Sequence, residues 1–311
     1  MFSIIIPLFN KENSIANTVE SVLNQSVSDF EVIIVDDGST DNSRKEVLGI
    51  KDSRIRLIEK ENGGVSSARN LGIKAANSPY VALLDGDDYW DSTFLEEQQK
   101  LIDDFPEAGM WGVNYAFVKG MSCAPCDQGM GEGFRGYVKD YFGSASHNDL
   151  YCSSSVVIKK DVFDSVGYFD ERIASSEDLD MWYRIILRYP VVYYDKVLAY
   201  YNQNAENRVA FDTDTRFPLT KDIKYYIDKF NRDFDTNKDF SRYLNSRVAA
   251  GLLKDGYYFG TKAERHDADH VVSLLRYGDI HPKYGWIFRT PRVLGRLVYS
   301  LVIIKKSLCR R

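Results

Sequence analysis

The feature that most constrains the fold is an alternation of apolar and amphipathic segments over the first hundred residues. Short segments rich in apolar residues lie at 4–8, 32–35, 54–58 and 80–84. Apolar runs of this length are typical of parallel strands that are covered on both faces. Segments with apolar residues at helical spacing follow, and we expect helices after Ser14, after Ser66 and from Phe94 to Phe105. The pattern predicts an α/β fold with a doubly wound, mainly parallel sheet.

Polar clusters follow each of the predicted strands. The clusters are Asn10–Glu12, Asp36–Asp37, Gly63–Gly64 and Asp85–Asp88. In open parallel sheets, ligands bind outside the carboxyl ends of the strands. We therefore expect these four loops to converge at one edge of the sheet and to form the active site there.

The segment Asp85-Gly86-Asp87 places two carboxylates directly after a buried strand. Two neighbouring carboxylates repel each other, and a cation relieves that repulsion. Oxygen ligands of this kind select Mg²⁺ or Mn²⁺, and Gly86 allows the backbone to approach a ligand closely. A solvated turn is the better explanation of an isolated Asp-x-Asp, but the apolar strand before this one favours a metal site.

Three further positions carry side chains with a chemical and a structural interpretation. Asp37 suits a base N–H or ribose hydroxyls, or it belongs to a turn. Arg69 suits a phosphate, or it lies on the surface. Asp178 opens a helix that we expect to reach Tyr189. There it serves either the helix dipole or general base catalysis on an acceptor hydroxyl.

The charge is unevenly distributed along the chain. The net charge is -5, and the stretch from His281 to Arg311 holds eight Lys or Arg and no acidic residue, which leaves -13 on the remainder. An acidic body argues against nucleic-acid binding. The basic, partly apolar segment 286–311 predicts contact with an anionic membrane surface, or alternatively a helix that packs on the body or on a second copy.

Targeting and cysteine patterns indicate the compartment. The N-terminus has neither a basic segment nor a long apolar stretch, no run reaches the length of a spanning helix, and four Cys do not make a disulfide scaffold. We expect a cytoplasmic protein, peripheral at the inner face of the membrane. Two other patterns, Cys123-Ala124-Pro125-Cys126 and the pair His266 and His270, are interpreted as structural, because neither has the partner residues of a metal or redox site.

Taken together, these motifs resemble glycosyltransferase family 2, the inverting enzymes with a GT-A fold. The matching stretches, over about residues 1 to 205, are 3–10 (SIIIPLFN), 35–41 (VDDGSTD), 62–70 (NGGVSSARN), 84–88 (LDGDD), 167–171 (GYFDE) and 176–178 (SED). Each motif is short, and their occurrence in the family's order makes the resemblance specific.

The resemblance implies a role for each site residue. Donor nucleotide binding falls to Pro7, Phe9, Glu12, Asp37, Arg69 and Asp85. By the same resemblance Asp87 contacts the Mg²⁺ or Mn²⁺ cofactor, and Asp178 is the catalytic base. Many relatives carry a His after the position of Tyr201, where this chain has Asn202-Gln203-Asn204, so no third protein ligand to the metal is expected.

The resemblance also implies the domain organisation and the reaction. A GT-A domain over 1–215 is expected to bind the nucleotide sugar through 1–105 and the acceptor through 106–215. The composition after that point, and not the resemblance, predicts a helical C-terminal region over 216–311 with a basic amphipathic tail. The expected reaction moves a sugar from a UDP-sugar to a hydroxyl of a glycan or lipid-linked acceptor, in polysaccharide, O-antigen or other surface-glycan assembly. The alternatives are a non-catalytic nucleotide-sugar-binding protein and a haloacid-dehalogenase-type phosphatase, although Tyr89 stands where such a phosphatase has a Thr.

Overall fold

The computed structural model describes residues 1–126, 129–144, 149–173 and 176–206, and in addition 229, 237–245 and 273. The chain divides into two compact units, Met1–Val209 and Ala210–Arg311. The basic segment 286–311 and the two histidines His266 and His270 lie outside the described residues. The description below concerns the first unit.

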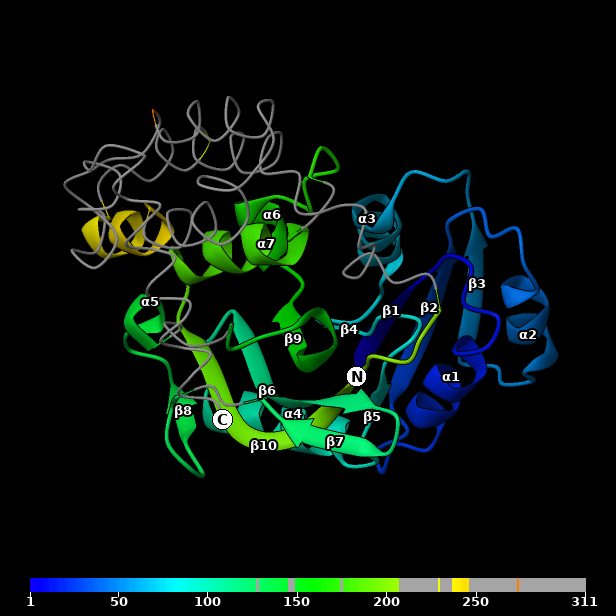
Figure 1. Ribbon diagram of the computed structural model, residues 1–311, viewed down its shortest axis with the longest axis horizontal. Coiled ribbons are helices and arrows are strands. Elements are labelled where there is room, and N and C mark those ends of the chain that lie inside the picture. Colours follow the sequence, from blue (N-terminus) through cyan, green and yellow to red (C-terminus); the bar gives the residue numbers. More distant parts are fainter. Residues whose placement is uncertain are drawn as a thin grey trace, which may run out of the picture. The chain divides into compact units, whose positions relative to one another are not determined.

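Four parallel strands form the half of the sheet that the sequence predicted. They are β1 (Phe2–Leu8), β2 (Phe30–Asp36), β3 (Ile55–Glu59) and β4 (Tyr80–Leu83), in the spatial order β3-β2-β1-β4. Figure 1 shows β1, β2 and β3 side by side. The apolar side chains of β1 and β2 are almost fully buried, which is the cause of their uninterrupted apolar sequence.

The other half of the sheet comes from the short segment 89–90 and from residues 110–202, much of which the sequence left without predicted elements. Strand β9 (Val156–Lys159) pairs antiparallel with both β4 and β6 (Met110–Lys119), and β6 pairs parallel with β10 (Val191–Asn202). Three short strands complete the sheet: β5 (Tyr89–Trp90), β7 (Ser122–Pro125) and β8 (Arg135–Tyr137). The described residues thus form one mixed ten-stranded sheet whose longest pairings are parallel, which confirms the predicted fold class.

Helices cover both faces of β1 and β2. Helix α1 (Ile15–Leu23) belongs to the core cluster with Ile4 and Ile34, whereas α3 (Val65–Ala75) packs against the opposite face. A Cβ on Gly72 of α3 would lie 2.4 Å from the Ile5 side chain, so the helix lies directly on β1. Helices α2 (Ser43–Gly49) and α4 (Phe94–Asp104) follow β2 and β5.

Two helix starts differ from the prediction. Gly64, with φ of 88°, precedes α3, so Ser66 lies inside the helix instead of capping it. Ser14 precedes α1 as expected, but its hydroxyl makes no capping bond and donates instead to Glu206. Ser14 thus has good capping chemistry but a different partner, because the loop around it is shaped by tertiary contacts.

The remaining helices of the first unit come from the middle of the chain. They are α5 (Tyr141–Ser144), the 3₁₀ turn η1 (Ser153–Ser155), α6 (Val162–Val166) and α7 (Glu177–Ile186). The predicted helix that opens at Asp178 is therefore confirmed, with an end three residues earlier than expected. No helix among the described residues is long and apolar enough to cross a lipid bilayer.

A buried ion pair fixes α7 to the loop before it. Arg184 donates to Asp180 one turn earlier on α7, with a shortest separation of 2.6 Å, and the Asp180 side chain is fully buried. The same guanidinium donates to the carbonyl oxygens of Val166, Gly167 and Tyr168. The position of α7 thus depends on a cation that satisfies four acceptors at once.

We expect Arg184→Met to destabilise the fold by about 3–5 kcal/mol, because it leaves the Asp180 carboxylate buried without a counter-charge. Urea denaturation monitored by circular dichroism measures the change. Arg188→Met is the matched control, since Arg188 is exposed and donates only to the Ser165 carbonyl, and it should change stability by less than about 0.5 kcal/mol. Equal losses in the two variants would contradict the structural role of Arg184.

Candidate functional site

The predicted polar loops lie together at the carboxyl edge of β1, β2 and β4 (Figure 1). The Thr40 N–H donates to the Asn10 side-chain oxygen at 2.8 Å, which joins the loops after β1 and β2. The Lys11 ammonium lies 2.7 Å from the Asp87 carboxylate, which joins the loops after β1 and β4. The predicted convergence of these loops is therefore confirmed by direct contacts.

Asp37 is buried and organises the loop that leads into α3. Its carboxylate accepts hydrogen bonds from the N–H groups of Gly63 at 2.9 Å and Gly64 at 2.8 Å. The Lys60 ammonium pairs with the same carboxylate. This arrangement fixes the Gly63–Gly64 turn next to the end of β2, where the sequence predicted a nucleotide-binding loop.

The residues at the end of β1 and in the loop after it that were assigned to the donor nucleotide differ in their surroundings. Phe9 is 42% exposed, so the face of its ring is accessible to a ligand. The carbonyl oxygen of Pro7 faces Gly86 in the turn after β4, since a Cβ on Gly86 would lie 2.9 Å from it. Glu12 is engaged elsewhere, because its carboxylate accepts from the backbone and side-chain N–H groups of Asn42 at 2.9 and 2.8 Å.

The Asp85-Gly86-Asp87 turn is held tightly against β1. The close approach of Gly86 to the Pro7 carbonyl leaves no room for a side chain, which explains the glycine between the two acids. Burial raises the pKa of Asp87 above its usual value; the Lys11 ammonium opposes this shift and the Asp85 carboxylate adds to it. The turn thus carries negative charge in a place that favours a nearby cation.

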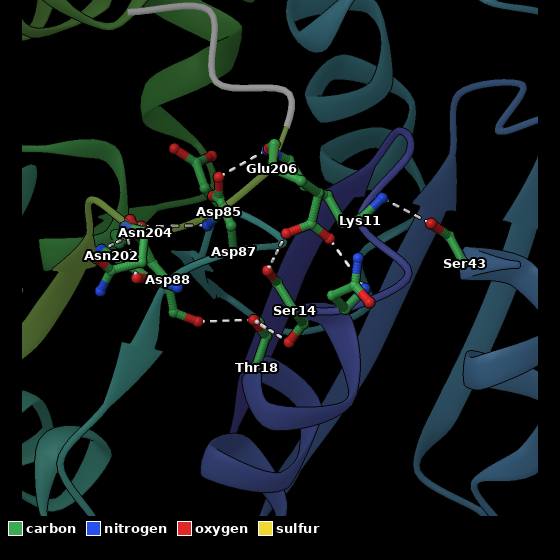
Figure 2. A network of polar contacts seen from close by, with 12 residues as sticks. Lys11, Ser14, Thr18, Ser43, Asp85, Asp87, Asp88, Asn202, Asn204 and Glu206 are labelled. Carbon is green, nitrogen blue, oxygen red and sulfur yellow. Dashed lines mark hydrogen bonds and ion pairs between the residues drawn. The ribbon is translucent and has the colours of Figure 1, made fainter. Parts of the chain in front are cut away.

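Asp88 connects this turn to three other segments (Figure 2). Its carboxylate accepts from the Ser154 hydroxyl and, at 2.9 Å, from the Asn202 N–H at the end of β10. Its carbonyl oxygen accepts from the Thr18 hydroxyl of α1 at 2.7 Å. Burial raises the pKa of Asp88 well above the ordinary value, and the neighbouring carboxylates of the turn add to the shift. Asp88 is therefore a support of the turn and is enclosed by protein.

Arg69 of α3 links the turn to α7. Its guanidinium is buried and lies 2.6 Å from both Asp85 and Glu177, so it bridges two carboxylates that are far apart in the sequence. The same group lies over the Phe169 ring at 5.3 Å. These two charge partners raise the pKa of Arg69 against the effect of burial, and the group stays charged. The sequence predicted Arg69 near the base or the phosphates, and the structure places it beside Asp85.

Asp178 follows Glu177 at the start of α7 and is half-buried. Burial raises its pKa to about 7; the Glu177 charge adds to the shift, and the Arg69 charge and the Leu179 N–H oppose it. Ser176, just before the helix, has a left-handed backbone with φ of 62°. Such a conformation is costly for a non-glycine residue and is often found at functional sites.

The Cys152 thiol shows that these acidic groups surround one region. Burial raises its pKa well above the ordinary value, and the charges of Asp88, Asp85 and Asp178 add to the shift while a hydrogen bond with Ser155 opposes it. Carboxylates from the β4 turn and from α7 thus act on the same thiol. Cys123 is exposed and Cys126 is buried, and neither forms a disulfide.

The turn after β4 suits a hard divalent cation. Mg²⁺ is commonly held by one or two carboxylates together with substrate phosphates and water, and Asp85 and Asp87 supply such a pair. Among the described residues there is no group of three or more His, Cys, Asp or Glu side chains that could hold a metal ion. A cation at Asp87 would accordingly take most of its ligands from a bound phosphate and water. The Lys11 ammonium on Asp87 shows that this position accepts positive charge.

Several residues of the site were not predicted from the sequence. Lys11, Ser154, Asn202 and Glu206 all make contacts in or beside the β4 turn. Lys11 falls inside a polar cluster that the sequence singled out, so its location was indicated although its partner was not. Glu206 and Ser154 carry no local signal, because their roles arise from contacts with segments distant in the chain.

The chain resembles known glycosyltransferases in sequence. A family model described as glycosyl transferase family 2 matches residues 3–164, just over half of the 311 residues. An uncharacterized glycosyltransferase EpsJ of Bacillus subtilis is 46% identical over 121 residues, which cover 38% of this chain and 34% of that protein. The Escherichia coli UDP-Glc:alpha-D-GlcNAc-diphosphoundecaprenol beta-1,3-glucosyltransferase WfgD is 37% identical over 123 residues, or 39% and 48% of the two chains. The matches thus span less than half the length of these relatives.

The fold is also similar to a solved structure. Residues 1–349 of S. aureus TarS in complex with UDP-GlcNAc superpose with a TM-score of 0.75 at 18% identity, over 96% of this chain and 88% of that chain. This likeness confirms the expected fold. Together with the family model and the polar loops at the carboxyl edge of the sheet, it leads to one assignment: the chain belongs to glycosyl transferase family 2.

Proposed function

We propose that the protein is an inverting glycosyltransferase that moves a sugar from a UDP-sugar to an acceptor hydroxyl in surface-glycan assembly. The observation that carries this proposal is the link from Asp85 through Arg69 to Glu177, the residue that precedes the half-buried Asp178 at the start of α7. A base and a site for a diphosphate are thereby joined by one buried guanidinium.

The donor is proposed to lie along the carboxyl ends of β1, β2 and β4. The exposed Phe9 ring offers a stacking surface for a base, and the Asp37 loop lies at the neighbouring strand end. UDP is the proposed nucleotide because the E. coli relative is a UDP-Glc glucosyltransferase by name and the similar TarS structure contains UDP-GlcNAc. Pro7, Glu12, Arg69 and Asp85 complete the proposed donor set.

Asp178 is proposed to be the general base. With a pKa of about 7, its carboxylate accepts a proton from the acceptor hydroxyl near neutral pH, where a base of matched strength is most effective. The acceptor oxygen then bonds to the anomeric carbon as the bond from that carbon to the diphosphate oxygen breaks. The nucleoside diphosphate leaves from the opposite face, so one displacement inverts the anomeric centre. Arg69 keeps Glu177 and Asp85 in place through the two ion pairs.

A Mg²⁺ or Mn²⁺ ion is the proposed cofactor, and Asp87 with Asp85 would hold it. When bound, such an ion neutralises the charge that develops on the leaving diphosphate. Burial and crowding of the two carboxylates support the assignment, because the turn gains stability when positive charge is added.

The acceptor is proposed to bind on the side formed by residues 106–215. Tyr89 and Tyr200 stack there with ring centroids 4.9 Å apart, and Phe117 packs edge-on against Tyr201 at 5.7 Å. These rings are half-buried and lie near Asn202, which contacts the acidic turn. Half-exposed tyrosines suit a sugar, since they combine an apolar face with a polar tip. A lipid-diphosphate-linked glycan is the proposed acceptor, because the E. coli relative is named for such an acceptor, alpha-D-GlcNAc-diphosphoundecaprenol.

The segment 286–311 is proposed to hold the protein at an anionic membrane, where a lipid-linked acceptor is found. Its Lys and Arg residues alternate with Leu, Val and Ile, a composition typical of interfacial helices. We expect the full chain, but not a variant that ends at residue 285, to float with vesicles that contain anionic lipid. Equal partitioning of the two forms would contradict the membrane role and leave the transferase assignment untouched.

Asp178→Asn should lower turnover by about 10²–10⁴-fold, because the amide cannot take the proton from the acceptor. Affinity for UDP should stay within twofold of wild type, as measured by calorimetry with Mn²⁺ present. Turnover is measured with UDP-sugars and a panel of hydroxyl acceptors. Wild-type binding without turnover on any acceptor would favour the non-catalytic alternative, and unchanged turnover in the variant would remove Asp178 from the role of base.

The pH dependence provides a second test of the same residue. Asp178 must be unprotonated to act, so wild-type kcat should rise with pH through about 7 and level off above it. The sign for stability is opposite: a raised carboxyl pKa in the folded state means that stability falls as pH rises from about 4 to 7. Asp178→Asn should therefore be more stable than wild type at pH 8, and the difference should vanish at pH 4. A parallel stability profile for the two proteins would contradict the raised pKa.

Asp87→Ala should abolish the part of UDP binding that depends on Mn²⁺. Calorimetric titrations of UDP with Mn²⁺ and with EDTA measure that part in wild type and variant. Asp91→Ala serves as the control. Asp91 lies only four residues after Asp87, but its carboxylate accepts from the Thr93 N–H and hydroxyl, just before the start of α4. Normal metal-dependent affinity in Asp87→Ala would contradict the assignment of the metal site.

A further inference from the structure

We propose that Lys11 is an exchangeable cation of the donor site. Its ammonium forms an ion pair with Asp87 while no divalent cation is bound. When a metal ion binds to Asp87, the ammonium would move to the diphosphate of the donor. This inference rests on the proposed function, and it gives a role to a residue outside the sets assigned above.

The Lys11 ammonium contacts both the turn after β4 and the segment after β10. The ammonium lies 2.7 Å from the Asp87 carboxylate and 2.6 Å from the Glu206 carbonyl oxygen. The side chains of Lys11 and Asp87 are 13% and 16% exposed, so the pair is largely shielded from water. Shielding from water strengthens the attraction between the ammonium and the carboxylate. For the same reason, the pair separates only when another charged group replaces the lost partner.

The segment after β10 provides a carbonyl acceptor for this ammonium at Glu206, and its backbone is fixed by further contacts (Figure 2). The Glu206 carboxylate accepts from the Asn13 N–H at 2.9 Å and from the Ser14 hydroxyl at 2.7 Å, which fixes the backbone beside Lys11. At the other end of the segment, the Asn202 N–H donates to Asp88. The Lys11 N–H donates to the Ser43 hydroxyl at 2.7 Å, so the backbone of Lys11 is held and its four-carbon side chain provides the motion.

The two neighbouring cations have other partners. Arg69 is buried between Asp85 and Glu177, and its displacement would leave two carboxylates without a counter-charge. Lys60 pairs with Asp37, at the end of β2. Lys11 differs from these two cations in that it contacts Asp87, the carboxylate that is the proposed metal ligand.

The exchange follows from the charges. A divalent cation on Asp87 replaces one positive charge by two, and it repels the ammonium that occupied the same oxygen. The diphosphate of the donor brings negative charge to the same place, and an ammonium is a strong partner for phosphate oxygens. Lys11 thereby competes with the metal before the donor binds and assists the metal afterwards.

Removal of this ammonium should consequently change metal and nucleotide affinity in opposite directions. In Lys11→Met, Mn²⁺ should bind severalfold more tightly without nucleotide, as measured by electron paramagnetic resonance of free Mn²⁺. The affinity for UDP at saturating Mn²⁺, as measured by calorimetry, should fall by at least about tenfold, because one charged hydrogen bond to phosphate is lost. Lys11→Arg keeps the charge and should restore most of the UDP affinity. Lys100→Met, which removes a charge from the exposed face of α4, should change neither quantity.

The outcomes separate this inference from the proposed function. Opposite shifts support the exchange. A parallel fall of both affinities in Lys11→Met indicates a structural role, and no change in either indicates no role at all; both results overturn the inference while normal wild-type binding of UDP keeps the proposed function. Failure of the wild-type protein to bind UDP in the presence of Mn²⁺ would overturn the proposed function, and with it this inference.

Discussion

The geometry of the site depends on the buried guanidinium of Arg69. It lies on α3 and pairs with Asp85 after β4 and with Glu177 on α7, so one side chain joins three elements. Without it, two partly buried carboxylates would repel each other and their neighbours, Asp87 and Asp178. The ion pairs thus make it possible to gather acidic groups near one another at the edge of the sheet.

The local charge distribution explains why this site suits the proposed ligands, a nucleoside diphosphate together with a divalent metal ion. The described residues place Asp85, Asp87, Asp88, Glu177 and Asp178 in neighbouring positions, whereas Arg69 and Lys11 are the cations that contact this group. Such an excess of negative charge is unfavourable in the free protein, and it is relieved by a hard cation with its bound phosphates. The raised pKa of Asp178 arises from burial together with the same crowding, so the proposed donor binding and the proposed role of Asp178 as base have a common electrostatic origin.

The sequence predicted those parts of the structure that depend on local pattern. Strand-length apolar runs and helical spacing identified β1 to β4, α1, α3 and α4, and the loops after these strands converge as expected. Contacts between distant residues were beyond such reasoning. Lys11 and Asp87 are 76 residues apart, and Arg69 and Glu177 are 108 apart, so neither pair leaves a periodic signal. Ser14 illustrates the same limit, since its capping chemistry was recognised but its hydroxyl has a distant partner in Glu206.

Strand β9 has a consequence for how substrates enter and leave. It pairs with β4 on one side and with β6 on the other, so the strands behind the donor loops and those behind the acceptor side belong to one hydrogen-bonded sheet. A hinge between the two sides would have to break this ladder, which makes rigid-body opening of a cleft within Met1–Val209 costly. On the proposed function, the connecting loops at the rim, and not a hinge within the sheet, are the parts of this unit whose movement would admit sugar nucleotide and release product.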